Sequence, residues 1–134
     1  MVKTDAKILL VDDFQSIRTI FKLELSRLGF KNIQEAKDGM EAYEQICLAH
    51  AAEIPFSLVI SDWNMPAMTG IELLKQLRAD QRFLNLSFFI VTAEEELKYA
   101  QEAMMAGATD FFVKPISAEA IGKKLEKTLK KVGG

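Results

Sequence analysis

The sequence of 134 residues lacks the features that mark several large classes of protein. It has one cysteine, Cys47, so it cannot form an internal disulfide, and a cytoplasmic location is expected. Its apolar runs, such as Ile8–Val11, extend to four residues, whereas a membrane-spanning helix needs roughly twenty. The N-terminus has no hydrophobic stretch like that of a secretory signal. We therefore expect neither a disulfide scaffold nor a membrane protein.

Positive charge is not in excess. Lys and Arg number 17 against 19 Asp and Glu, and a chain with a net charge of -2 has no general attraction for a nucleic-acid backbone. Hydrophobic residues make up 49%, which argues against disorder and is enough for a core. The length suits one domain, so we expect a single domain over residues 1–134, with its core at about 7–129, and a monomer.

Short aliphatic or β-branched runs alternate with longer segments of helical period. We expect five strands, at Lys7–Val11, Asn32–Ala36, Ser57–Ser61, Ser87–Val91 and Asp110–Val113. Their starts lie 23 to 30 residues apart, which is typical of βα units in a parallel sheet. The first, third and fourth runs are continuously apolar, as in strands that helices cover on both faces. The sequence therefore predicts a doubly wound α/β fold.

Five segments of helical period lie between and after these strands. In the first, apolar residues recur at spacings of three and four, and a glycine follows; these residues are Phe14, Ile17, Phe21, Leu25, Leu28 and Gly29. The second and third segments open at Asp38 and Thr69, the fourth runs from about Glu94 to Ala106, and the last follows Ser117. The expected buried stripe of the last helix is Ile121, Leu125, Leu129 and Val132.

Charged and hydroxyl side chains stand at the carboxyl ends of four expected strands, which is the edge where open parallel sheets bind ligands. They are Asp12 and Asp13, Asp62, Thr92 and Lys114. Clustered carboxylates repel one another, and a hard divalent cation such as Mg²⁺ relieves that repulsion. A metal, a spare carboxylate, a lysine and a hydroxyl are together the parts needed for phosphoryl transfer.

Each of these residues also has a structural alternative. Asp12 or Asp13 could cap the first helix, Asp62 could be a turn residue, Thr92 could cap the fourth helix, and Lys114 could be a solvated loop lysine. Taken singly, such roles are common. Their coincidence at four strand ends favours a functional site instead. Zinc is not favoured, because the single histidine, His50, stands near the end of the second helix.

Five segments of this chain resemble the receiver domain of two-component response regulators, above all the single-domain regulators of chemotaxis. They are Val11–Phe14, Ser61–Pro66, Val91–Glu94, Ala106–Ala108 and Val113–Pro115, and the resemblance extends from about Lys7 to Leu129. It implies a flavodoxin-like sheet of order 2-1-3-4-5 with five helices. It also implies a phosphorylation-controlled signalling switch rather than an enzyme that turns over free substrates.

The resemblance implies a role for each matching residue. Asp62 corresponds to the phosphorylated aspartate, and the Mg²⁺ ligands correspond to Asp13, Asp62 and the backbone carbonyl of Asn64, with Asp12 in support through water. Thr92 and Lys114 correspond to the switch hydroxyl and its lysine. Asn64 and Glu94 border the approach of water and so tune dephosphorylation, and the Lys114–Pro115 bond is expected to be cis.

Two departures from the family pattern matter. The family carries an aromatic residue, usually tyrosine, three residues before the lysine, and here Phe111 lacks the hydroxyl. The connection from Cys47 to Phe56 is longer than usual, and we assign it no role.

The implied partners are a histidine kinase as phosphodonor, a phosphatase, and a downstream target such as a flagellar motor switch protein. We expect the target to bind a surface on the fourth helix, fifth strand and fifth helix, centred on Phe111. Because the last helix is rich in lysine, an acidic and apolar helical peptide is the expected ligand, with Phe111 turned inward in the active state.

Two other functions fit the sequence less well. A phosphatase with an aspartate nucleophile usually has a second acid two residues later, where this chain has Asn64, and a cap insertion that this chain lacks. A flavin-binding module would need a phosphate loop after the first strand, where Asp12 and Asp13 would repel a phosphate.

Overall fold

The structure is a computed structural model, and it describes residues 5–93 and 97–133. Its sheet has five parallel strands in the order β2-β1-β3-β4-β5. The strands are β1 (Lys7–Val11), β2 (Asn32–Ala36), β3 (Leu58–Asp62), β4 (Ser87–Ala93) and β5 (Asp110–Lys114). The helices are α1 (Gln15–Arg27), α2 (Gly39–Ala51), α3 (Gly70–Arg78), α4 (Leu97–Met105) and α5 (Ala118–Gly133), with a short 3₁₀ helix η1 (Gln81–Phe83). The predicted fold class and strand order are confirmed.

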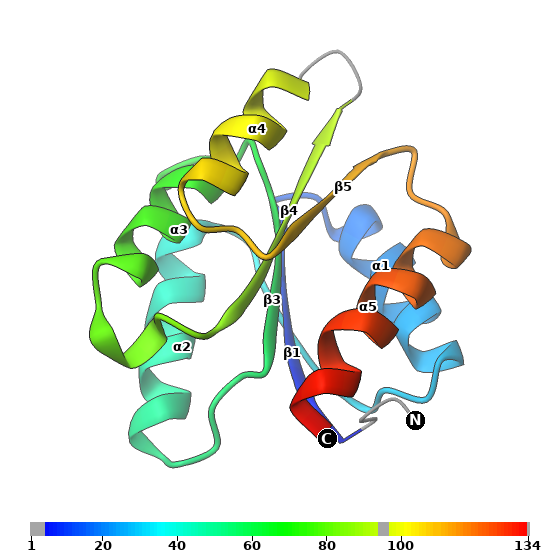
Figure 1. Cartoon of the computed structure of the whole chain (residues 1–134), viewed down its shortest axis with the longest axis horizontal. Helices are drawn as coiled ribbons and strands as arrows, with labels where there is room; N and C mark the ends of the chain where they lie inside the picture. Colours follow the sequence, from blue (N-terminus) through cyan, green and yellow to red (C-terminus); the bar gives the residue numbers. More distant parts are fainter. Residues whose placement is uncertain (1–4, 94–96, 134) are drawn as a thin grey trace.

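Helices cover both faces of the sheet: α1 and α5 lie on one face and α2, α3 and α4 on the other (Figure 1). Alternate residues of each strand therefore face different layers. In β1, Leu9 and Val11 belong to the cluster under α2 and α3, whereas Ile8 and Leu10 belong to the cluster under α1 and α5. This two-sided burial explains why β1, β3 and β4 each contain a continuous apolar run.

Three of the predicted strands end too early, and the difference concerns the site, since β5 also extends one residue further, to Lys114. β3 includes Asp62, and β4 runs on to Ala93, so Thr92 lies inside a strand. Because Thr92 belongs to β4 and α4 is described from Leu97, the alternative role of Thr92 as a helix cap is wrong. The predicted start of the fourth helix, Glu94, lies outside the described residues.

Part of the apolar stripe that was predicted for the first helix is exposed in the structure. Phe21 and Leu25 are buried, but 61% of Phe14 and 41% of Leu28 are exposed. Both flank α1 rather than belong to it, since Phe14 precedes its first residue and Leu28 follows its last. In α5, by contrast, Ile121, Leu125 and Leu129 are buried as predicted, and the side chain of Val132 lies outside the described part.

The first part of the long connection from Cys47 to Phe56 is helix. α2 continues to Ala51, and Glu53 then adopts a φ of 63°, a conformation that glycine usually supplies after a helix. Gly29 and Gly107 hold the corresponding positions after α1 and α4, with φ values of 100° and 107°. The loop is anchored to β1, because the Nζ atom of Lys7 donates a hydrogen bond to the carbonyl of Ile54 at 3.1 Å.

No helix in the described ranges 5–93 and 97–133 is both long and apolar enough to span a bilayer.

Candidate functional site

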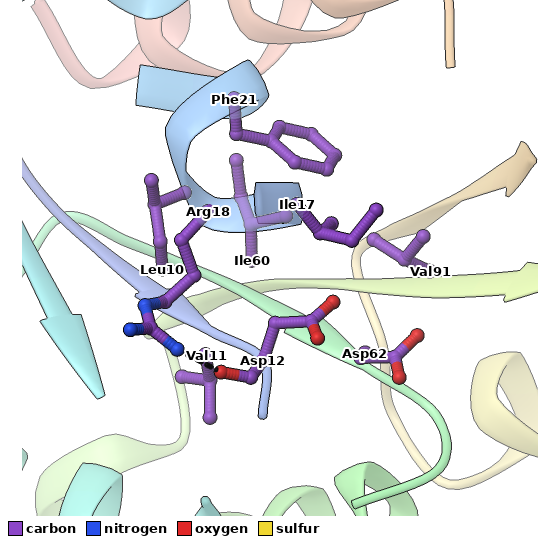
Figure 2. A pocket seen from close by; sticks show the side chains of 9 residues that line it. All are labelled: Leu10, Val11, Asp12, Ile17, Arg18, Phe21, Ile60, Asp62 and Val91. Carbon is purple, nitrogen blue, oxygen red and sulfur yellow. Dashed lines mark hydrogen bonds between the residues drawn. The ribbon is translucent and has the colours of Figure 1, made fainter. Parts of the chain in front are cut away.

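Three carboxylates meet at the carboxyl end of the sheet. Val11 of β1 pairs with Ser61 of β3, so Asp12 and Asp62, which follow these residues, lie side by side. Each of Asp12, Asp13 and Asp62 places one carboxylate oxygen within 4.8 Å of the others. Figure 2 shows the carboxylates of Asp12 and Asp62 next to each other at this edge. The predicted clustering of the acids is thus present in the structure.

Burial makes two of these carboxylates hard to ionise. Asp12 and Asp62 are 5% and 7% exposed, whereas Asp13 is exposed. Burial, with the nearby charge of Asp62, raises the pKa of Asp12 from 3.8 to about 6, although a hydrogen bond from the backbone N–H of Phe14 opposes the rise. Burial also raises the pKa of Asp62, although the positive charge of Lys114 and its hydrogen bond act to lower that pKa. The site therefore concentrates negative charge that a cation would stabilise.

Lys114 and Thr92 complete the site from the neighbouring strands. The Nζ atom of Lys114, at the end of β5, lies 3.1 Å from Oδ1 of Asp62. Thr92, buried in β4, lies between them in the sheet, and the Lys114–Pro115 peptide bond is cis. A hollow of about 170 Å³ opens above them, lined by Phe14, Asp62, Trp63, Asn64, Val91, Thr92, Ala93 and Lys114. It has room for a small tetrahedral group beside Asp62.

Among the described residues, four predicted site residues do not line this hollow: Asp12, Asp13, Phe111 and Pro115. Glu94 lies outside the described residues. Phe111 lies on β5 and lines a different hollow, of about 490 Å³, with residues of α4. His50 is also remote, since its ring packs edge-on against Phe83 with centroids 5.5 Å apart.

Arg18 belongs to the site, and the sequence analysis missed it. Its Nη1 atom donates to the backbone carbonyl of Asp12 at 2.6 Å, and its Nε atom donates to Glu35 of β2 at 2.9 Å (Figure 2 shows Arg18 and Asp12). Arg18 thus ties the acidic segment to α1 and to the sheet. No local motif signals this role, because the contact depends on how α1 packs over β1 and β2.

Comparison with known proteins identifies the family. Residues 8–126 match the response regulator receiver domain. The chain belongs to that family. The chemotaxis protein CheY of Pseudomonas aeruginosa is 43% identical over 128 residues, which are 96% of this chain and 99% of that protein. The chemotaxis protein CheY-3 of Vibrio cholerae is 39% identical over 132 residues, covering 98% of each chain. The resemblance noted in the sequence is confirmed.

Solved structures agree with this assignment. The structure of the chemotaxis response regulator CheY4 of Vibrio cholerae superposes with a TM-score of 0.78 at 37% identity, covering 94% of this chain and 100% of that one. Membership of the receiver family implies phosphorylation-dependent signalling in a two-component system, and its relatives associate the chain with chemotaxis. Receiver domains take phosphoryl groups from histidine kinases and bind downstream targets.

Receiver domains bind Mg²⁺ at an acidic pocket, and the residues of this chain fit that ion. The donors are carboxylate oxygens, with no histidine or thiol among the described residues of the cluster, which is the set that a hard cation prefers. Two of the three carboxylates are buried, so a divalent charge would offset their mutual repulsion.

The raised pKa of Asp12 predicts an unusual dependence of stability on pH. A carboxyl whose pKa is higher in the folded than in the unfolded chain stabilises the fold when protonated, and this contribution is lost between about pH 4 and pH 6. Without Mg²⁺, we expect the free energy of unfolding to fall as pH rises through this window, and Asp12→Asn should flatten the profile. Urea unfolding at several pH values measures this, and identical profiles for both proteins would contradict it.

Proposed function

We propose that this chain is a cytoplasmic response regulator of a chemotaxis pathway, and that Asp62 accepts the phosphoryl group. The observation that carries the proposal is the ion pair between Asp62 and Lys114 at 3.1 Å, beside an open hollow and two further carboxylates. Of the three carboxylates, Asp62 is the one that both lines this hollow and contacts Lys114. It is therefore placed for attack on an incoming phosphorus atom.

In the proposed reaction, a carboxylate oxygen of Asp62 attacks the phosphorus of a phosphohistidine. The bond from phosphorus to the imidazole nitrogen breaks, and the departing imidazole takes a proton from solvent, so that an acyl phosphate remains on Asp62. Mg²⁺, when bound, would neutralise charge on the phosphoryl oxygens. Asp13, Asp62 and the backbone carbonyl of Asn64 would hold it, and Asp12 would support it through water.

Lys114 and Thr92 act after the transfer. Lys114, now paired with the Asp62 carboxylate, can pair with a phosphoryl oxygen instead, and the Thr92 hydroxyl moves toward the same group. Asn64 is exposed on the rim of the hollow, where it can influence the approach of water to the acyl phosphate. Together with Glu94, it is the proposed determinant of the dephosphorylation rate, which a partner phosphatase would increase.

The proposed output surface comprises α4, β5 and α5. Phe111 lines its hollow of about 490 Å³ with Leu97, Ala100, Gln101, Met104 and Met105. Lys124 of α5 holds this region, since its Nζ atom lies 3.2 Å from Asp110 and 4.8 Å from the centre of the Phe111 ring. That cation–π contact gives Phe111 a partner in place of the one that a tyrosine hydroxyl would find. An acidic, apolar helical segment of a flagellar switch or kinase protein suits this surface.

Binding of beryllofluoride, which imitates a phosphoryl group, tests this function. With Mg²⁺, we expect amide shifts at Asp62 and Thr92 and also on α4, β5 and α5, because new bonds at the phosphoryl site must move the output surface. The measurement is a pair of amide correlation spectra, with Asp62→Asn as the control that should show no shifts on α4. Shifts confined to the strand ends would contradict the proposed output surface.

A further inference from the structure

An aromatic pair links the phosphorylation site to α4. The rings of Trp63 and Tyr99 are stacked, with centroids 4.3 Å apart and an interplanar angle of 14°. Trp63 directly follows Asp62, and its side chain lines the hollow beside that carboxylate. Tyr99 lies in the first turn of α4, on the helix that carries part of the proposed output surface. The pair thus joins the two regions that signalling must couple.

Trp63 is fixed more firmly by its neighbours than the helix that carries Tyr99. The backbone of Trp63 is fixed on both sides, because its N–H donates to the carbonyl of Val91 at 2.9 Å and its carbonyl accepts from the N–H of Gly70 at 3.0 Å. In α4 the buried residues are Ala100 and Ala103, whose small side chains give the helix little apolar anchorage. The stack of Tyr99 on Trp63 is thus a large aromatic contact near the first described residues of α4.

We propose that Tyr99 is a positioning residue whose stack on Trp63 holds α4 in the phosphate-free arrangement and so opposes activation. The inference rests on the proposed function, in which Thr92 moves toward the phosphoryl group on Asp62. Ala93 ends the same strand and leads to α4, so α4 shifts with Thr92, while Trp63 stays with its two backbone hydrogen bonds. The rings then separate, and the stack stabilises only the phosphate-free state.

A stack of this kind biases an equilibrium by about twofold to tenfold. Tyr99→Ala should therefore bind beryllofluoride about twofold to tenfold more tightly than the wild type at saturating Mg²⁺. Tyr99→Leu, which restores apolar volume but no ring, should behave as Tyr99→Ala does. Tyr99→Phe keeps the stacked ring and should bind with wild-type affinity. Affinities are measured by following the amide of Lys114, a probe that does not involve the aromatic pair.

The fluorescence of Trp63, the single tryptophan, provides a second readout that a merely structural role would not move. In the wild type and Tyr99→Phe, beryllofluoride should shift the emission toward that of phosphate-free Tyr99→Ala, because Trp63 loses its stacked neighbour. In Tyr99→Ala the shift should be smaller. Thermal unfolding of all four proteins checks that each variant is folded.

The outcomes separate this inference from the function on which it rests. If wild type, Tyr99→Ala and Tyr99→Leu bind beryllofluoride equally, or if the variants bind it more weakly, the stack does not oppose activation. If Tyr99→Phe binds as tightly as Tyr99→Ala, the hydroxyl rather than the ring is responsible, and the inference is again wrong. If beryllofluoride binds none of the four proteins, the proposed function fails as well.

Discussion

Asp62→Asn should abolish the phosphoryl adduct that the wild-type protein forms with acetyl phosphate and Mg²⁺. The amide of asparagine is a poor nucleophile, and it removes the charge that pairs with Lys114 at 3.1 Å. Intact-mass spectrometry measures the result directly, because the adduct adds the mass of one phosphoryl group. The expected change is complete loss of the adduct, since no other carboxylate of the cluster both lines the hollow and contacts Lys114 among the described residues.

Asp13→Ala is the matched control for this result. It removes a neighbouring carboxylate of the same cluster but leaves Asp62 and Lys114 in place. A hard cation that loses an oxygen ligand binds more weakly, so this variant should still form the adduct but require more Mg²⁺. If the adduct persists in Asp62→Asn and disappears in Asp13→Ala at every Mg²⁺ concentration, Asp62 is not the acceptor.

The strand-end residues could be predicted because the sheet is parallel. In such a sheet every strand points the same way, so the residues that follow Val11, Ser61 and Val113 meet at one edge, whatever the length of the loops between the strands. The alternation of runs and helical segments therefore sufficed to place Asp12, Asp62 and Lys114 together. The exact ends of β3, β4 and β5 could not be predicted in this way, since Asp62, Thr92 and Lys114 are polar residues that pair as strand.

Contacts between elements could not be predicted from the sequence pattern. Arg18 contacts Asp12 and Glu35, and Tyr99 contacts Trp63, only because α1 and α4 pack over the sheet at particular positions. Helical periodicity predicts which residues face inward but not which neighbour each one meets. These packed contacts position the predicted site residues.

Gly70→Ala should destabilise the fold and weaken the site together. Gly70 is the first residue of α3, and a Cβ atom there would lie 2.3 Å from the carbonyl oxygen of Asp62 and 2.7 Å from Cδ1 of Ile90. The first of these atoms is backbone of the proposed acceptor, so the clash can be relieved only by moving Asp62 or α3. We expect a loss of about 1–3 kcal/mol in the free energy of unfolding, as for an overpacked core.

Gly122→Ala in α5 tests whether that loss comes from the clash rather than from the substitution itself. A Cβ at Gly122 would meet Leu28 at 3.7 Å, which is an ordinary contact, and alanine is the better helix former by about 1 kcal/mol. Gly122→Ala should therefore match or exceed the wild type in urea unfolding, while Gly70→Ala falls below it and binds Mg²⁺ more weakly. Equal stability of the two variants would contradict this prediction, because it would mean that the backbone at Asp62 moves away from the added Cβ atom at no cost in stability.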